Sequence, residues 1–185
     1  PMIEFNIIPN HGVTWNYLGE IVCVEAYGSH GIRVRATREK NFPDDHLSAL
    51  LEVSTPHAVI EETEESILLK NGDITAEISR FGVLRFLNHK GKELFREYKR
   101  NLTHRGTDYL PQKVDPRFIR PMGSGDYRIT ARFESDPQER IYGMGQYQQT
   151  QLNLKGCVLE LAQRNTQSTV PFFLSSCGYG FLWNN

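Results

Sequence analysis

The segment from Tyr142 to Gly156, YGMGQYQQTQLNLKG, holds the densest group of uncharged hydrogen-bonding side chains in the sequence. It contains four glutamines, one asparagine and three glycines within fifteen residues. Each side-chain amide offers two N–H donors and an acceptor oxygen without adding charge. Gly143 and Gly145 permit backbone conformations and close approaches that a Cβ would prevent. The composition therefore indicates a loop built to bind a neutral polar ligand or to pack through amide hydrogen bonds.

Other chemistry has little support in the residue types and their spacing. The three cysteines (Cys23, Cys157 and Cys177) form no C-x-x-C pair, so we interpret them as reduced structural thiols. The six histidines (His11, His30, His46, His57, His89 and His104) are scattered without metal-ligand spacing. The sequence has no phosphate-binding loop, G-x-S-x-G motif or dinucleotide fingerprint. We therefore expect no metal and no cofactor.

Composition and charge exclude several classes of partner. The chain has 185 residues, of which 39% are hydrophobic and 23% charged, and its formal net charge is -1. This balance provides no strong field for nucleic acid or a membrane surface. No apolar run approaches the roughly 18 residues that span a bilayer. The N-terminal residues PMIEFNIIPN lack the features of a secretory signal, so we expect a cytoplasmic protein.

The elements that must position the amide-rich segment are predicted to be β-strands. Residues 126–134 alternate apolar and polar side chains without a break, and residues 31–37 and 73–79 repeat this period of two. Such alternation is typical of strands with one buried and one solvated face, as in antiparallel sheets. The remaining strand candidates are residues 3–8, 21–26, 58–62, 66–70, 83–88, 92–97, 157–163, 169–175 and 180–183.

The segments between these strands carry turn residues and little helical signal. Asn71-Gly72 is typical of a tight hairpin, and residues 43–51 alone favour a short helix, capped by Asp44 or Asp45. Residues 98–124 have three prolines and little periodicity, which indicates a long crossing loop. The sequence therefore predicts an all-β fold, a two-layer antiparallel β-sandwich with at most one short helix.

The C-terminal quarter resembles a known family. Residues 139–146 read ERIYGMGQ, residues 152–156 read LNLKG, and residues 163–184 carry QRN, VPFFLSS and GYGFLWN in that order. This order of motifs is similar to the end of the N-terminal β-sandwich domain of glycoside hydrolase family 31, a domain that resembles galactose mutarotase. The IRVRA stretch of residues 32–36 resembles an upstream strand of the same domain. Gln146, Asn153 and Lys155 favour the α-xylosidase branch over the α-glucosidases.

The resemblance implies an α-glycosidase whose reacting groups lie outside residues 1–185. In the family a (β/α)8 barrel follows the sandwich and supplies an aspartate nucleophile and an aspartate acid/base for a retaining reaction. Retention needs two carboxylates about 5–5.5 Å apart. The family nucleophile follows a Trp-x-Asp pattern, and this sequence contains none. We therefore expect residues 1–185 to form one N-terminal domain, without the barrel, without catalytic residues and inactive alone.

The same resemblance gives the amide-rich segment a role. In the family, the loop after Y-G-x-G reaches over the barrel mouth and helps to shape the subsite for the sugar leaving group. The substrate-binding candidates are Gln146, Tyr147, Gln148, Gln149, Gln151 and Asn153, with the Tyr147 ring as a stacking face. The expected partner is an α-linked oligosaccharide held together with the barrel. Lys155 could instead pair with a carboxylate.

Several alternatives remain open at this point. An α-glucosidase parent would share the domain, and an autonomous carbohydrate-binding module would need an exposed aromatic platform. Trp15, Tyr17 and Tyr27 fit the alternation of strand residues, so they do not by themselves indicate such a platform. A mutarotase-like epimerase would need a histidine and a carboxylate that converge, which the scattered histidines do not support. We also expect the separate domain to expose an apolar patch where the barrel would dock, which would permit self-association.

Overall fold

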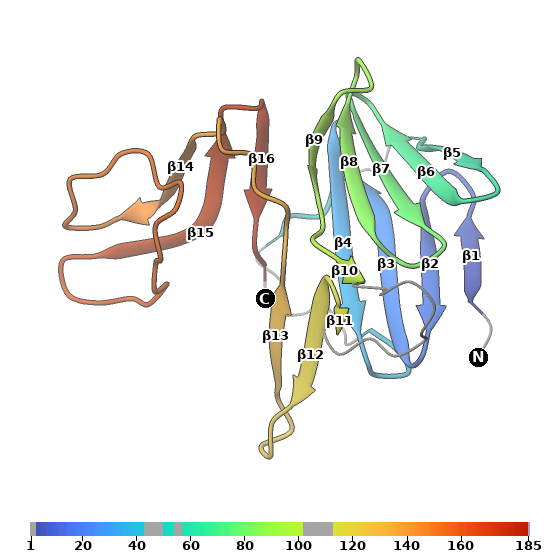
Figure 1. Cartoon of the computed structure of the whole chain (residues 1–185), viewed down its shortest axis with the longest axis horizontal. Helices are drawn as coiled ribbons and strands as arrows, with labels where there is room; N and C mark the ends of the chain where they lie inside the picture. The colour runs from blue at the N-terminus through green and yellow to red at the C-terminus, as the bar shows by residue number, and fades with distance from the viewer. Residues whose placement is uncertain (1–2, 43–49, 54–56, 102–112, 185) are drawn as a thin grey trace. The chain divides into compact units, whose positions relative to one another are not determined.

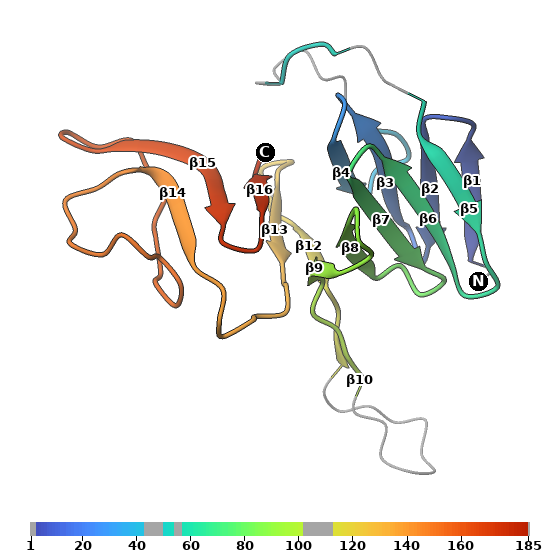
Figure 2. The same cartoon turned by 90° about the horizontal axis from the view of Figure 1, so that it is seen from above.

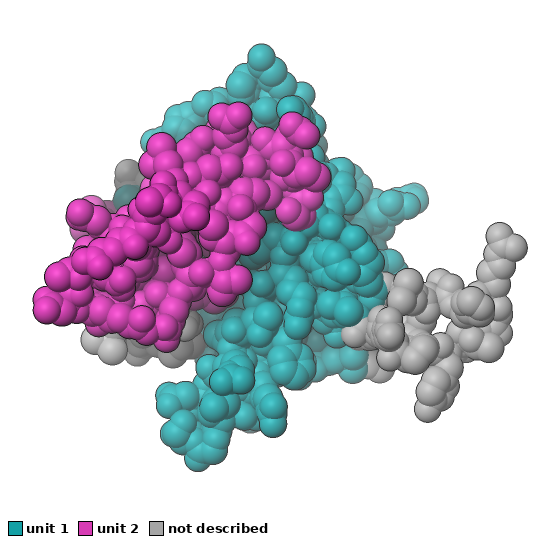
Figure 3. All heavy atoms as spheres, turned by 60° about the vertical axis from the view of Figure 1, so that its left-hand side comes forward, with its two compact units in different colours: residues 1–44, 53–134 teal, residues 45–52, 135–185 magenta. Residues whose placement is uncertain are grey.

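A computed structural model describes residues 3–42, 50–53, 57–101 and 113–184 of the chain. The described residues contain strands and turns and no helix. Contacts between Cα atoms divide the chain into two compact units, coloured separately in Figure 3. Unit 1 comprises residues 1–44 and 53–134, and unit 2 comprises residues 45–52 and 135–185.

Unit 1 is built on two antiparallel meanders, labelled in Figure 1. The four-stranded sheet contains β1 (Glu4–Ile8), β2 (Gly12–Tyr17), β3 (Glu20–Tyr27) and β4 (Gly31–Thr37), in that order. The five-stranded sheet contains β5 (Val59–Glu62), β6 (Ser66–Asn71), β7 (Ile74–Ser79), β8 (Leu84–Asn88) and β9 (Glu93–Arg96). Each strand pairs with its sequence neighbours through short turns, as local hairpin chemistry favours.

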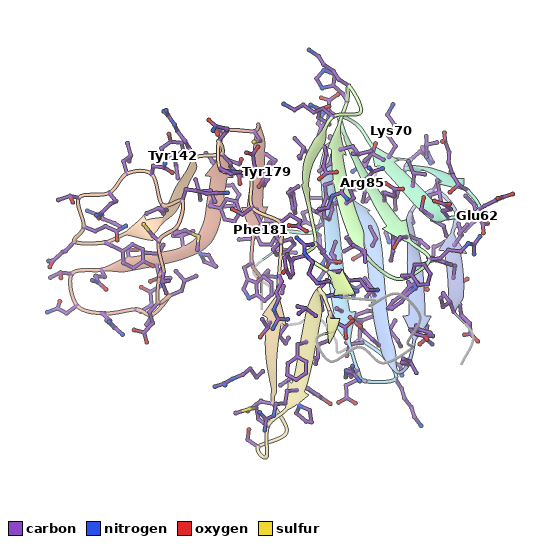
Figure 4. The ribbon with its side chains drawn as sticks, viewed as in Figure 1. Glu62, Lys70, Arg85, Tyr142, Tyr179 and Phe181 are labelled. Carbon is purple, nitrogen blue, oxygen red and sulfur yellow. The ribbon has the colours of Figure 1, made fainter. Side chains whose placement is uncertain are left out.

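The core lies between these two sheets, which form the two layers seen from above in Figure 2. Alternate residues of each strand face inward, as period-two patterning requires. The buried side chains are Val13, Trp15, Val22 and Val24 from the first sheet and Ile67, Ala76, Ile78, Leu84 and Phe86 from the second. The second sheet also carries Arg85, labelled in Figure 4, which forms ion pairs with Glu77 and Glu93. The predicted two-layer antiparallel β-sandwich is therefore confirmed.

Two short strand pairs complete unit 1. β10 (Arg100–Asn101) pairs with β11 (Lys113–Val114), and β12 (Arg117–Pro121) pairs with β13 (Tyr127–Ala131). Arg117 fastens the second hairpin to the sandwich. Its guanidinium forms ion pairs with buried Glu97 and, at 2.7 Å, with Glu20, and donates a hydrogen bond to the Gly82 carbonyl oxygen.

Unit 2 contains a separate three-stranded antiparallel sheet. Its strands are β14 (Ile141–Gln146), β15 (Ser168–Ser175) and β16 (Tyr179–Leu182), with β15 in the centre. Leu154 is the one buried hydrophobic residue among the described residues of this unit, whereas unit 1 buries fourteen. Unit 2 therefore depends on hydrogen bonds and on aromatic contacts more than on an apolar core of its own.

Several predicted elements differ from the structure. Residues 157–163 were expected to form a strand but do not, because Ala162 and Gln163 meet β15 through side-chain hydrogen bonds with Thr169 and not through a backbone ladder. β2, β10, β11, β12 and β14 were missed, and β10, β11 and β12 show that the expected crossing loop of residues 98–124 is partly strand. The expected helix at residues 43–51 falls on positions of which 43–49 lie outside the described residues. The other predicted strands are present within three residues of their expected ends.

Candidate functional site

The first half of the amide-rich segment is a bulged strand, which corrects the prediction that all of it is loop. β14 pairs with β15 in register on both sides of a shift between Gly143 and Gly145. Both glycines have positive φ angles, 117° and 105°, and Met144 between them has a φ of 68°. A Cβ on Gly143 would lie 2.8 Å from the Phe172 carbonyl oxygen, and one on Gly145 would overlap the Ser168 carbonyl oxygen. Glycine is therefore required at both positions, as the sequence indicated.

The bulge places the candidate binding residues beyond the end of the strand. Gln146 is the last residue of β14, and the others lie in the following loop. The Tyr147 hydroxyl contacts the Thr169 hydroxyl at 3.0 Å, and the Gln148 amide donates to the Thr166 hydroxyl at 3.0 Å. Tyr147 and Gln148 therefore hold the loop against the start of β15.

Asn153 has a different role. Its side-chain oxygen accepts hydrogen bonds from the backbone N–H groups of Ile141, at 3.0 Å, and Lys155, at 3.2 Å. These two hydrogen bonds hold the end of the loop against the start of β14. They are separate from the hydrogen bonds of Tyr147 and Gln148, which reach Thr169 and Thr166. Gln149 and Gln151 are exposed, and within the described parts of the chain their side chains form no hydrogen bond. The six candidates thus do not form one cluster.

The motifs that carry the family resemblance meet at Glu139. This carboxylate is buried and accepts hydrogen bonds from the Ser175 hydroxyl at 2.6 Å and the Tyr179 hydroxyl at 2.5 Å. Lys155 forms an ion pair with it at 2.7 Å, which confirms the alternative that this lysine pairs with a carboxylate. Ser175 also accepts the Cys177 backbone N–H, so it links the carboxylate to the β15–β16 turn. Three segments distant in sequence, those of Glu139, Lys155 and the β15–β16 hairpin, are thereby joined at one charged group.

The environment of Glu139 sets the ionisation of the cluster. Burial would raise the pKa of Glu139, but hydrogen bonds from Lys155, Ser175 and Tyr179 outweigh it and leave that pKa below its ordinary value. The pKa of Tyr179 is raised, first by burial and then by its hydrogen bond to the carboxylate. At neutral pH Glu139 is therefore a carboxylate and Tyr179 a neutral hydrogen-bond donor. This arrangement suits a structural role for the cluster of Glu139, Lys155, Ser175 and Tyr179.

Acidification is expected to destabilise unit 2 by protonating Glu139 in this cluster. Because the folded-state pKa of Glu139 is lowered, its contribution to stability is present above the unfolded pKa of about 4.3 and is lost as pH falls through the folded value. Amide NMR of β14, β15 and β16 should show loss of these resonances below about pH 4. Glu139→Gln should remove this pH dependence, and an unchanged acid transition in that variant would contradict the prediction.

The two faces of the three-stranded sheet differ in character. Phe173, Phe181 and Trp183 stack in a row on one face, with centroid separations of 5.2 Å and 6.5 Å. Figure 4 labels Phe181 and Tyr179 on β16. The other face exposes four apolar side chains, and their exposed fractions are 47% for Val170, 37% for Phe172, 55% for Leu174 and 45% for Leu182. This face of unit 2 therefore exposes apolar side chains, and a docking site for the barrel stays a prediction.

Sequence reasoning missed a polar cluster in unit 1. His11 Nε2 lies 3.3 Å from Glu25 Oε2, and Arg33 and Arg35 form ion pairs with the same buried carboxylate at 3.4 Å and 3.2 Å. Pairing of β3 with β2 and β4 brings these residues together, so spacing along the chain carried no signal. A histidine and a carboxylate do converge here, but the two arginines already compensate the charge of Glu25. The cluster is better suited to holding the sheet than to moving a proton.

Within residues 3–42, 50–53, 57–101 and 113–184, no group of three or more His, Cys, Asp or Glu side chains is arranged to hold a metal ion. The described residues include no helix long and apolar enough to cross a membrane.

Comparison with known proteins defines the class first. Residues 21–185 match the family model of the glycosyl hydrolase 31 N-terminal galactose mutarotase-like domain. The chain therefore belongs to this family of N-terminal domains, as the motifs of its C-terminal quarter predicted.

Individual relatives refine the comparison. A protein of Pseudescherichia vulneris, described as an uncharacterized family 31 glucosidase, is 41% identical over 184 residues, which cover 95% of this chain and 35% of that protein. Alpha-xylosidase A of Aspergillus niger is 28% identical over 89% of this chain and 24% of the enzyme. The chain thus spans about a third or less of the length of these relatives.

Solved structures show the same fold. A GH31 α-xylosidase from a soil metagenome, crystallised with xylose, matches with a TM-score of 0.89 and 40% identity over 98% of this chain and 28% of that one. The GH31 α-xylosidase of Xanthomonas citri matches with a TM-score of 0.72 and 28% identity, over 97% of this chain and 19% of that one. The fold of this chain therefore recurs in enzymes that are several times longer.

Proposed function

We propose that this chain is the non-catalytic N-terminal domain of a retaining α-glycosidase that releases terminal α-linked xylose. The observation that carries this proposal is the 40% identity and 0.89 TM-score to a GH31 α-xylosidase that was crystallised with xylose. Release of glucose by the parent enzyme is the second candidate, favoured by the glucosidase description of the relative that is 41% identical.

The buried carboxylates of the chain support a non-catalytic role. A retaining glycosidase needs one carboxylate free to attack and a second that carries a proton. Among the described residues the buried carboxylates are Glu25, Glu97 and Glu139, and each forms an ion pair with arginine or lysine. A carboxylate held this way is a poor nucleophile and a poor acid, so we assign the chemistry to a following barrel domain.

The apolar face of unit 2 supports a docking role for this domain. Val170, Phe172, Leu174 and Leu182 leave apolar surface in water that a monomeric domain would normally bury. A partner domain that covers them would supply the apolar burial that unit 2 lacks. We assign this face to contact with the barrel, and in the separate chain the same face would favour a homo-oligomer.

The amide-rich loop is proposed to contribute to substrate binding. Gln146, Gln149 and Gln151 are the best placed of the six candidates, because their side chains are exposed and form no hydrogen bond with another described residue. Tyr147, Gln148 and Asn153 would act by holding the loop in position. The substrate would be an α-linked oligosaccharide, and the compartment would be the cytoplasm, where the three free cysteines would remain reduced.

Hydrolysis of p-nitrophenyl α-xyloside and α-glucoside by the full-length parent enzyme tests the function, with this 185-residue chain as control. We expect the parent to turn over the xyloside and the separate chain to turn over neither substrate, because the acid and the nucleophile lie outside it. Preference for the glucoside would leave the family assignment unchanged and overturn the xylosidase assignment. Turnover by the separate chain would overturn the non-catalytic assignment.

The same assay with oligosaccharide substrates tests whether the amide-rich loop contacts the substrate. Gln151→Ala in the parent enzyme should raise KM by about 3–10-fold, equivalent to loss of one hydrogen bond. The matched control is Gln138→Ala, an exposed glutamine outside the loop. An unchanged KM for Gln146→Ala, Gln149→Ala and Gln151→Ala would contradict direct contact between these side chains and the substrate.

A further inference from the structure

A cavity in unit 2 lies on the aromatic face of the three-stranded sheet. Its volume is about 420 Å³, and its lining residues are Leu161, Gln163, Thr169, Pro171 and Trp183. Sites for small ligands occupy volumes of roughly 300–1,000 Å³. The cavity is therefore of a size that holds a small ligand.

We propose that this cavity binds one pyranose ring of a saccharide, with Trp183 as the stacking surface and Gln163 as the hydrogen-bonding group. The proposal rests on the proposed function only for the choice of saccharide. Neither residue was among the sequence-based binding candidates.

The lining selects for a neutral ligand with one apolar face and a polar edge. Trp183, Pro171 and Leu161 provide apolar walls, Gln163 and Thr169 provide uncharged polar atoms, and no charged side chain lines the cavity. An anion or a cation would find no compensating charge there. A pyranose fits this pattern, because its C–H face can lie on the electron-rich face of an indole while its hydroxyls meet an amide.

Trp183 is held ready for such a contact. It remains 37% exposed, while its ring stacks at 14° to the Phe181 ring, which in turn stacks on Phe173. Its backbone N–H donates to the Pro171 carbonyl oxygen at 2.8 Å. A ring that is already positioned loses little conformational entropy when a ligand binds. Trp15, by contrast, is buried in the sandwich core and cannot act as a platform.

Gln163 is positioned by the strand beside it. Its amide nitrogen donates to the Thr169 carbonyl oxygen at 3.0 Å, and its oxygen accepts the Thr169 backbone N–H at 3.3 Å. The Thr169 hydroxyl also donates to the Ala162 carbonyl oxygen, which holds the segment of residues 157–163 against β15. A glutamine amide has two N–H donors and two acceptor lone pairs. One of each remains available to sugar hydroxyls after the bonds to Thr169 are made.

The test is a titration of the chain with methyl α-xyloside and methyl α-glucoside, followed by amide NMR shifts of Gln163 and Thr169. We expect saturable shifts with a Kd of about 1–10 mM, as befits a single ring. Trp183→Ala should weaken binding by about tenfold or more. Leu161→Trp should abolish binding, because the larger side chain fills the cavity. This substitution removes no hydrogen bond. Leu182→Ala, the exposed neighbour on the opposite face of β16, should bind as the unmodified chain does.

Sorbitol is the control ligand, because it has the hydroxyls of a sugar without the flat ring. Saturable shifts of equal size with sorbitol, unchanged binding in Trp183→Ala, or absence of saturable shifts up to the solubility limit would each overturn the proposal. The titration needs no turnover, so it is independent of the xyloside assay. A parent enzyme that hydrolyses xylosides while this cavity binds no sugar would refute the cavity assignment and leave the proposed function standing.

Discussion

Replacement of Arg117 by methionine is expected to lower the free energy of unfolding of unit 1 by about 3–5 kcal/mol. Arg117 is 7% exposed, and its guanidinium compensates Glu97, which is 3% exposed, and Glu20. Burial raises the pKa of Glu97 even though Arg117 acts to lower it. Without the arginine, Glu97 would have to remain buried and unpaired or take up a proton. Either outcome costs far more than the ion pair itself contributes.

Urea unfolding followed by the fluorescence of Trp15 measures this loss, with Arg96→Met as the matched control. Arg96 pairs with Glu93 on the solvated side of the sheet, where both side chains are at least one-third exposed, so its loss should cost less than about 1 kcal/mol. Adding Glu97→Gln to Arg117→Met should recover part of the stability, since glutamine removes the charge and can still accept the Leu84 backbone N–H. Equal effects of Arg117→Met and Arg96→Met would contradict the burial argument.

Gly145→Ala is expected to disrupt the pairing of β14 with β15 and to cost about 2–5 kcal/mol of local stability. Two effects combine at this position. A φ of 105° lies outside the range that alanine adopts readily, and the added Cβ would overlap the Ser168 carbonyl oxygen. The neighbouring atoms belong to backbone that is fixed in the ladder, so they cannot move aside without breaking it. The bulge that directs residues 146–153 away from the sheet would be lost with the pairing.

Peptide-resolved hydrogen exchange over β14 and β15 measures this effect, and Gly156→Ala is its matched control. Gly156 also has a positive φ, 79°, but a Cβ there would have no atom within 4 Å among the described residues. Its substitution should therefore cost only the strain of the left-handed conformation, about 1–2 kcal/mol. If both variants showed the same protection of β15 amides, the close approach at Gly145 would have no energetic consequence.

Much of the sandwich could be predicted because its strands have recognisable local sequence patterns. Residues 31–37 and 73–79 alternate strictly, and turn residues such as Asn71-Gly72 separate neighbouring strands, so sequence order gives the pairing order in both meanders. β12 was missed because its five residues, RFIRP, end in a proline and bury Ile119 alone. A strand with a single buried side chain has too little periodicity to be recognised.

The candidate site was less predictable, because side-chain partners depend on which strands become neighbours. The amide content of the loop singled out six residues, yet three of them hold the loop in place. Trp183 and Gln163 belong to the motifs of the family resemblance but were not binding candidates, since a tryptophan at the end of a strand and a single glutamine look like ordinary structural residues. They line one cavity only because residues 157–163 lie beside β15 rather than pairing with it.

The sequence by itself determined the all-β class, the sandwich and the family, because alternation and the order of motifs are properties of the linear chain. Tertiary structure alone decided that Glu139, Lys155, Ser175 and Tyr179 meet at one carboxylate, and that His11 and Glu25 converge. It also decided that residues 157–163 are not a strand, since the Gln163 side chain takes the backbone N–H and carbonyl oxygen of Thr169 that a paired strand would use. Period two fixes which face a side chain occupies, whereas the neighbour it meets on that face depends on contacts between distant segments.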